Sequence, residues 1–232
     1  MKETFSQLSI QSKEDCLSHL FFPDSTLAIL MGGQSERMGT PKHRLLHRES
    51  GVSLWQWQLE KFGESFSSIL LLPGRQTLEL AETKVTRGIR VVPDKCGFEG
   101  QGPLSALLAA IESCTTKWLY FVAVDYPHLN MELFKLMNEH KSKGEIIVPE
   151  DSQGQAQWLC GLYEVSLKSA LSKALENGTR SMRGFCRDAE TYSIPWSGAL
   201  PGQTLDNINT PEQASEAGFR LPSATELIEK TN

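Results

Sequence analysis

The stretch that decides the fold is Leu-Ala-Ile-Leu-Met-Gly-Gly-Gln-Ser-Glu-Arg-Met-Gly-Thr-Pro-Lys-His-Arg-Leu-Leu, residues 27–46. Its apolar beginning, Leu27–Met31, predicts a short buried strand that stops at the paired glycines Gly32 and Gly33. Glycines after a buried strand let backbone N–H groups turn toward an anion, because no Cβ stands in the way. The stretch therefore predicts a strand followed by a loop that holds phosphates.

Positive charge and a third glycine complete this loop. Arg37 and Lys42 lie on either side of Gly39, and both are expected to bind phosphate oxygens. The spacing matches neither G-x-x-x-x-G-K-[ST] nor G-x-G-x-x-G, so a kinase-like or a dinucleotide-binding loop has no direct support. Further basic residues follow the loop and would attract an anion locally, with both histidines expected at the surface: His43, Arg44, His47 and Arg48.

The composition bounds the class of protein. The chain has 232 residues, of which 40% are hydrophobic and 22% charged, which is enough for one sizeable core. A formal net charge of −5 argues against a broad nucleic-acid-binding surface. No apolar run approaches the ~18 residues of a membrane span. The charged N-terminal residues are not typical of a secretory signal, and five scattered cysteines without a C-x-x-C pair predict reduced thiols in a cytoplasmic protein.

Short apolar segments alternate with amphipathic ones along most of the chain. Strands are expected, besides Leu27–Met31, at Ser67–Leu72, Ile89–Val92, Trp118–Val124, Glu145–Val148, Gln157–Tyr163, Thr191–Ile194 and Thr204–Ile208. Helices are expected at Val52–Phe62, Pro103–Ile111, Met131–His140, Ser166–Glu176, Ser181–Cys186 and Pro211–Ala217. The alternation predicts an α/β fold with a mostly parallel central sheet flanked by helices.

One domain accounts for this pattern. Residues 1–24 are polar and are separated from the first apolar run by Pro23 and Asp24, so we interpret them as an N-terminal extension. Residues 25–220 form the predicted α/β domain, and residues 221–232 a polar C-terminal tail.

Three candidate ligand residues follow expected strands: Gly32, Asp94 and Asp125. Ligands of open parallel sheets bind beyond the carboxyl ends of the strands, so we expect these residues at one edge of the sheet. A carboxylate fixed at Asp125 and facing phosphates suits Mg²⁺, whereas the alternative is an aspartate that caps the turn or the next helix. Asp94 either holds a ligand hydroxyl or base, or closes its own turn.

The remaining chemistry points to charge neutralisation. Lys42 is positioned to stabilise charge that develops on an α-phosphate or a leaving pyrophosphate. No serine or cysteine pairs with a histidine in a recognisable pattern, so covalent catalysis is not expected. Near the C-terminus, Thr210 before Pro211 predicts a helix N-cap, while Asn207 and Asn209 either support that turn or offer amides to a ligand.

Together these segments resemble the molybdenum cofactor guanylyltransferase family, one branch of the nucleotidyltransferases with a Rossmann-like, glycosyltransferase-A-like fold. The family pattern L-A-G-G-x-S-x-R-M-G-x-x-K is similar to residues 30–42, and its aspartate before a glycine-rich segment is similar to Asp94. Three more motifs match in order: G-P-L at residues 102–104, an aspartate followed by x-P at residues 125–127, and N-x-N-T-P-E at residues 207–212. The first motif marks the larger group, and the last points to the molybdopterin branch.

The resemblance, which spans about residues 27–217, implies an activity. Such an enzyme transfers GMP from GTP to molybdopterin, forming molybdopterin guanine dinucleotide and pyrophosphate. By carry-over, the nucleotide-binding residues would be Leu30, Met31, Gly32, Gly33, Lys42, Asp94 and Asp125. Asp125 would bind Mg²⁺, and the catalytic group would be Arg37, Lys42 and Asp125. Partners would be GTP, molybdopterin, and molybdoenzymes or other cofactor-delivery proteins.

Two departures from the family pattern keep alternatives open. Pro41 before Lys42 is more typical of related branches that activate sugars or isoprenoid precursors. The stretch Leu72-Pro73-Gly74-Arg75 lacks an asparagine that often contacts the nucleotide in the family. The alternatives are a cytidylyltransferase acting on molybdopterin, another nucleotidyltransferase of the same fold with a sugar phosphate acceptor, and a non-catalytic accessory protein that binds molybdopterin or nucleotide.

Overall fold

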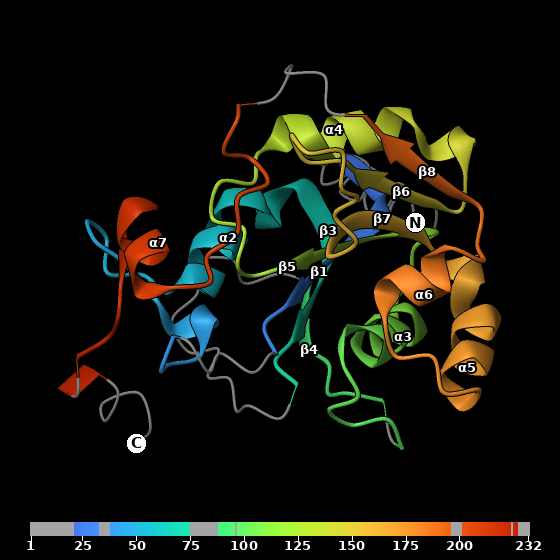
Figure 1. Ribbon diagram of the computed structural model, residues 1–232, viewed down its shortest axis with the longest axis horizontal. Helices are drawn as coiled ribbons and strands as arrows, with labels where there is room; N and C mark the ends of the chain where they lie inside the picture. The colour runs from blue at the N-terminus through green and yellow to red at the C-terminus, as the bar shows by residue number, and fades with distance from the viewer. Residues whose placement is uncertain are drawn as a thin grey trace, which may run out of the picture.

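The computed structural model describes residues 21–32, 38–74, 88–95, 97–195, 201–223 and 225–226. Within these residues, seven strands form a central sheet in the order β4-β3-β1-β5-β7-β6-β8 (Figure 1). The strands are β1 Phe22–Leu30, β3 Phe66–Leu72, β4 Ile89–Val91, β5 Trp118–Ala123, β6 Ile146–Pro149, β7 Cys160–Glu164 and β8 Thr191–Ile194. Neighbouring strands run parallel except around β7, which is antiparallel to both β5 and β6. The predicted mostly parallel sheet is therefore confirmed.

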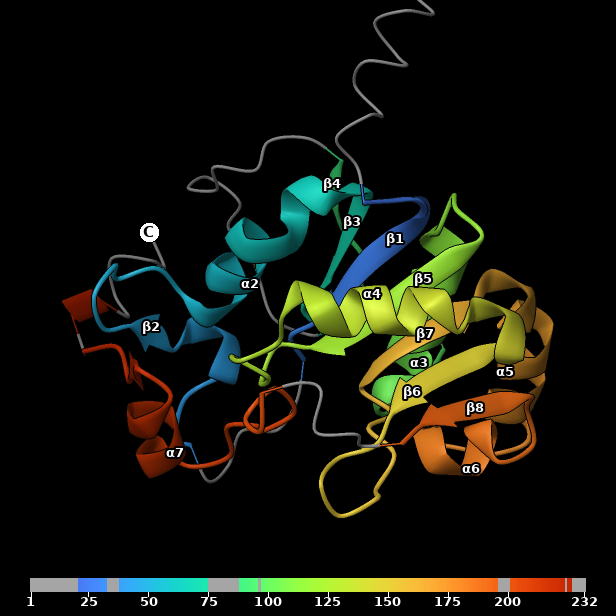
Figure 2. The same ribbon diagram turned by 90° about the horizontal axis from the view of Figure 1, so that it is seen from above.

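Helices cover both faces of this sheet. The α-helices are α2 Leu54–Phe62, α3 Pro103–Ser113, α4 Met131–Glu139, α5 Lys168–Glu176, α6 Met182–Cys186 and α7 Pro211–Glu216. Short 3₁₀ turns lie at η1 Lys42–Arg44, η2 Gly63–Ser65, η3 Lys141–Lys143 and η4 Val165–Leu167. Figure 2 shows α2 and α4 on one face, with α3, α5 and α6 on the other. The helices predicted from the apolar spacing are confirmed, with ends that shift by one or two residues.

The strands are apolar on both faces because both faces are buried. Along β1, Leu27 and Ile29 belong to the core under α2 and α4, whereas Ala28 and Leu30 belong to the core under α3 and α5. Successive side chains of a strand point to opposite faces, so a continuous apolar run is what a doubly covered sheet requires. This explains why the strand segments show no polar alternation.

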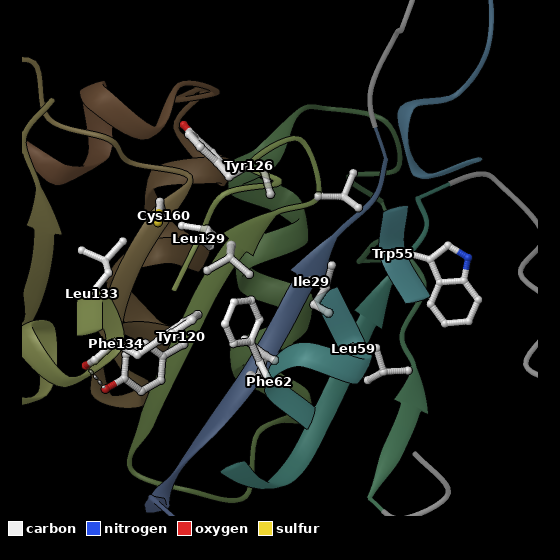
Figure 3. Close-up of a cluster of buried hydrophobic side chains, with 14 of the residues drawn as sticks. Ile29, Trp55, Leu59, Phe62, Tyr120, Tyr126, Leu129, Leu133, Phe134 and Cys160 are labelled. Atoms are coloured by element: carbon white, nitrogen blue, oxygen red, sulfur yellow. Dashed lines mark hydrogen bonds between the residues drawn. The ribbon is translucent and has the colours of Figure 1, made fainter. Parts of the chain in front are cut away.

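Aromatic residues fix the core between the sheet and α4. Figure 3 shows Phe62, Tyr120 and Phe134 packed together, with the rings of Phe62 and Phe134 4.9 Å apart between centroids. The Tyr120 hydroxyl, which is carried into this apolar core, donates a 3.0 Å hydrogen bond to the carbonyl of Phe134. Burial raises the pKa of Tyr120 well above its ordinary value, so the hydroxyl stays protonated and keeps donating. Strand β5 and helix α4 are thereby held in one relative position.

A second, two-stranded sheet was not predicted. Antiparallel strands β2 Leu46–His47 and β9 Phe219–Arg220 join the segment after Lys42 to the segment after α7. The His47 ring stacks on Trp57 with 4.2 Å between centroids and meets the edge of Phe219 at 5.4 Å. The C-terminal segment therefore folds back onto the beginning of the domain. A pairing of two residues with two residues leaves no periodic signal in the sequence.

Two further expectations differ from the structure. Strand β1 begins at Phe22 and includes Pro23 and Asp24, because Phe22 packs in the aromatic core, with its ring 5.1 Å from that of Phe66. The strand expected at Thr204–Ile208 is wrong: Thr204 donates to Pro201 in a turn, and the apolar residues there fill the core from a loop. Apart from Phe22–Asp24, which belong to β1, the extension stays a prediction, and so does the tail, since residues 1–20 and 227–232 lie outside the described ones. Among the described segments, no helix is both long and apolar enough to cross a bilayer.

A substitution at Gly144, shortly before β6, tests the packing of the sheet. A Cβ added to Gly144 would stand 2.6 Å from the carbonyl oxygen of Glu190, which is backbone and cannot move aside cheaply. We expect Gly144→Ala to lower the free energy of unfolding by about 1–3 kcal/mol, the usual range for overpacking. Urea denaturation measures the change. Gly202→Ala is the control, because that glycine has open space around it and no positive φ; equal stability of the two variants would contradict the packing.

Candidate active site

The site forms around an ion pair between residues distant in the sequence. The Lys42 Nζ donates to Asp125 Oδ2 over 2.7 Å, and the two side chains are 19% and 18% exposed. Lys42 opens the 3₁₀ turn η1, directly after Pro41. Asp125 follows β5 by two residues. An ammonium and a carboxylate are therefore held together at a surface that solvent still reaches.

The sheet explains why Asp125 lies there. Strands β1 and β5 run parallel, with Leu30 opposite Ala123, and the Val124 N–H donates to the carbonyl of Leu30 over 2.9 Å. The two strands thus end at the same edge, and the chain turns immediately after it. The carbonyl of Asp125 accepts a 2.8 Å hydrogen bond from the N–H of Ile208, which ties the turn to the C-terminal segment.

Asn209 is the third member of this cluster. Its Oδ1 accepts a 2.8 Å hydrogen bond from the Lys42 Nζ, and its Nδ2 donates to the Oδ1 of Asn207 over 2.8 Å. The next residue, Thr210, caps α7 by accepting from the N–H of Gln213, as the sequence predicts. The paired asparagines before a capped helix left two interpretations open, and the contact with Lys42 places Asn209 in the site.

The backbone N–H groups at the start of the glycine loop bond to the sheet, whereas the sequence predicts that they face an anion. The N–H groups of Met31 and Gly32 both donate to the carbonyl of Leu72, at 2.9 and 3.2 Å, so they continue the sheet and do not face an anion. A Cβ on Gly32 would lie 3.3 Å from the Cα of Gly74, so the close approach of two turns is what makes glycine suit this position. Gly33 and Arg37 lie outside the described residues.

Asp94 lies at the same edge of the sheet but is engaged locally. It follows β4, in which Val91 stands opposite Leu71 of β3. The Asp94 Oδ2 accepts a 2.8 Å hydrogen bond from the N–H of Gly100. Of the two alternatives, this contact is the one that closes the turn leading into α3. Asp94 and Asp125 thus follow strands that end at the same edge of the sheet, as expected, and a shared ligand stays a prediction.

The basic residues after the loop do not act as one cationic patch. His43 was expected at the surface, and this is wrong: it is 2% exposed. Burial, with a smaller effect from Arg44, lowers the pKa of His43 to about 4, so the ring is neutral near pH 7. His47 packs on Trp57, and Arg48 donates from Nη2 to the Ser215 Oγ over 2.7 Å. Of the basic residues that the structure describes in this stretch, Lys42 is the one with an ion pair to Asp125.

The donor set fits a metal that is shared with a phosphate ligand. The described residues contain no group of three or more histidine, cysteine, aspartate or glutamate side chains that would enclose a metal. Mg²⁺ commonly takes one or two carboxylates and completes its shell with phosphate oxygens and water. Asp125 offers such a carboxylate, and Lys42 offers a cation for the same phosphates. The arrangement therefore suits chemistry on a phosphate chain.

Comparisons with known proteins agree with this interpretation of the site. A family model described as a MobA-like NTP transferase domain matches residues 27–192. A molybdenum cofactor guanylyltransferase from Yersinia pseudotuberculosis is 28% identical over 190 residues, covering 82% of this chain and 92% of that protein. The crystal structure of molybdopterin-guanine dinucleotide biosynthesis protein A from Archaeoglobus fulgidus superposes with a TM-score of 0.65 at 19% identity, covering 89% and 100% of the two chains. Rv0371c of Mycobacterium tuberculosis, solved as a manganese complex, gives a TM-score of 0.55 at 13% identity over 84% of this chain and 98% of that one.

Because His43 is buried beside the site, we expect the free energy of unfolding to depend on pH. The folded pKa of His43 lies below its unfolded value, so the folded state binds fewer protons, and its contribution to stability is lost as the pH falls from 6.5 toward about 4. A difference of one bound proton between the folded and unfolded states changes the unfolding free energy by about 1.4 kcal/mol per pH unit. We expect His43→Gln to show a shallower fall in unfolding free energy across this window, measured by urea denaturation at several pH values. An unchanged slope would contradict the assignment.

Proposed function

We propose that this chain, which belongs to the MobA-like NTP transferase family and is therefore a nucleotidyltransferase, transfers GMP from GTP to molybdopterin. The products would be molybdopterin guanine dinucleotide and pyrophosphate. The observation that carries the proposal is the cluster of Lys42, Asp125 and Asn209 at the carboxyl edge of the parallel sheet, where this fold class binds ligands. The similarity to a molybdenum cofactor guanylyltransferase supports the choice of substrates.

The reaction is a displacement at the α-phosphate of GTP. An oxygen of the molybdopterin terminal phosphate forms a bond to this phosphorus, and the bond from the phosphorus to the bridging oxygen of the β-phosphate breaks. Pyrophosphate leaves with the electron pair of that bond. Both reactants are anions, so catalysis depends on holding them in line and on balancing their charge. Neither task needs a nucleophile from the protein.

Each residue of the cluster has a proposed part in this scheme. Asp125 would hold Mg²⁺, which supplies positive charge next to the phosphate oxygens when bound. The Lys42 ammonium would pair with oxygens of the triphosphate, and Asn209 orients it through the 2.8 Å hydrogen bond. Arg37 would add a second cation, and Gly33 a backbone N–H. Leu30, Met31, Gly32 and Asp94 would contact the nucleotide, as the resemblance to the family implies.

The ion pair also explains how the site stays ordered before a ligand arrives. A partly buried cation or carboxylate without a partner is costly, and each of the two groups here satisfies the other. Anionic phosphates would take over Lys42, and the metal would take over Asp125. We further propose that the reaction takes place in the cytoplasm and that the product passes to molybdoenzymes or other cofactor-delivery proteins.

The same cluster would serve a second nucleotide. Lys42 and Asp125 recognise phosphates and a metal, which GTP and CTP share, so a cytidylyltransferase acting on molybdopterin is the alternative. Pro41, which precedes Lys42, is more typical of related branches that activate sugars or isoprenoid precursors. A nucleotidyltransferase of the same fold with a sugar phosphate acceptor is therefore a further alternative. An accessory protein that only binds molybdopterin or nucleotide would show no turnover with any pair of substrates.

The decisive experiment is pyrophosphate release by the purified protein with Mg²⁺ and molybdopterin, comparing GTP, CTP, ATP and UTP. We expect release with GTP, and loss of most of it in Asp125→Asn, which keeps the shape of the side chain but not its charge. A circular dichroism spectrum of the variant checks that it is folded. Release with CTP alone would replace guanine by cytosine in the proposal. Absence of release with all four nucleotides, from folded protein and intact pterin, would overturn it.

Replacing Lys42 distinguishes an effect on the rate of the reaction from an effect on nucleotide affinity. If its charge acts mainly on the reacting phosphates, Lys42→Met should lower kcat by about 100-fold or more, in the range seen when a stabilising donor is removed. The apparent Kd for GTP, from equilibrium binding, should change by a much smaller factor. Arg48→Met is the control, because that guanidinium bonds Ser215 and the carbonyl of Phe219. A Lys42→Met enzyme in which only the affinity fell would show that Lys42 binds nucleotide without acting on the transition state.

A further inference from the structure

A buried amide from α2 reaches the turn that carries Asp125. Gln58 is 1% exposed, and its Nε2 donates to three backbone carbonyls. The acceptors are the oxygens of Ala123, Val124 and Tyr126, at 3.4, 3.2 and 3.1 Å. The last two distances lie near the ordinary range for such bonds, and the first is longer. The three carbonyls also decide the orientation of the amide, because only its nitrogen can donate to them.

These contacts involve the residues on both sides of Asp125 in the sequence. The residues that Gln58 holds come directly before and directly after it, and the carbonyl of Asp125 itself accepts from the N–H of Ile208. Four consecutive carbonyls, from Ala123 to Tyr126, therefore have donors from other segments of the chain. A backbone held at every carbonyl has little freedom to rotate, so the direction in which the Asp125 side chain leaves it is set.

The other end of the amide shows that packing alone does not account for Gln58. Its Oε1 is buried and has no hydrogen-bond partner among the described residues. An unsatisfied buried acceptor is unfavourable, and a methionine would fill a similar volume without one. The two N–H groups must therefore do something that offsets the orphaned oxygen.

Helix α2 is a firm support for this amide. It begins with a capping box in which the N–H of Ser53 donates to the Gln56 Oε1 over 3.0 Å. Its side chains Trp55, Leu59 and Phe62 belong to the core on this face of the sheet, and Figure 3 shows Phe62 close to β1. The same view places Tyr126 beyond the end of β5. A side chain on this helix can therefore transmit a fixed position to the turn.

We propose that Gln58 is a positioning residue: by holding the carbonyls on both sides of Asp125, it aims that carboxylate at the metal and phosphates of the nucleotide. The inference rests on the proposed role of Asp125 as a metal ligand. Gln58 touches neither substrate nor metal, and it acts through the backbone of the turn. Residues that support metal ligands from outside the coordination shell typically change metal affinity by about 10–100-fold when they are replaced.

The test compares Gln58→Met with Ser53→Ala. The methionine keeps the length and volume of the side chain and removes its donors. Ser53→Ala weakens the cap of the same helix, which controls for a general loss of stability, and its side chain bonds Gln56. The first readout is thermal melting with GTP or CTP, in Mg²⁺ and in EDTA. The second is the Mg²⁺ concentration that gives half-maximal turnover.

For Gln58→Met we expect the extra rise in Tm that Mg²⁺ adds to nucleotide binding to fall by at least about half, while the rise seen in EDTA stays. We expect the half-maximal Mg²⁺ concentration to increase about ten-fold. Ser53→Ala should lower the Tm of the free protein and leave both readouts unchanged. If Gln58→Met behaves like Ser53→Ala, Gln58 is purely structural and the inference is wrong. A wild-type protein whose melting responds to neither nucleotide would instead overturn the proposed nucleotide site, and this inference with it.

Discussion

The parallel pairing of β1 with β3 and β5 is the constraint on which the rest of the structure depends. Leu30 stands opposite Leu72 on one side and Ala123 on the other, so three strands end at one edge. A parallel sheet needs a crossover between its strands, and among the described residues α2 lies between β1 and β3, and α3 between β4 and β5. Because the strands are buried on both sides, a shift of register would expose or misplace whole rows of apolar side chains. The positions of Gly32 and of Asp125 follow from this register.

The site itself is built by segments that meet only in the folded chain. Lys42 comes from the turn after the first loop, Asp125 from the end of β5, and Asn209 from the residues before α7. The small sheet of β2 and β9 brings the C-terminal segment back beside the first, which lets Asn209 reach Lys42. Each contact satisfies a polar group that would otherwise be costly at a partly buried position. The cluster is thus both a support of the fold and a place where phosphates and a metal would find complementary charge.

Much of the fold could be predicted because its signals are local. Apolar runs ended by glycine or proline marked the strands, and the T-P-E sequence after Asn209 marked the cap of α7. The strand at Phe22 was missed because Pro23 and Asp24 look like a boundary, and only the aromatic core around Phe66 explains why the chain stays extended there. The burial of His43 was missed for the same kind of reason: basic neighbours suggested a surface, whereas the buried position of the ring belongs to the packing around the loop.

The sequence by itself determined the class of the fold, the residues at the ends of the strands, and the family to which the chain belongs, since periodicity and motif spacing depend only on neighbours along the chain. The tertiary structure alone decided that Met31 and Gly32 direct their N–H groups to Leu72 and not to an anion. It also decided that Gln58 holds the turn around Asp125. These contacts join residues forty or more positions apart, and their geometry is set by the register of strands and the placement of helices. No local pattern records such geometry, because it arises only when the whole core is packed.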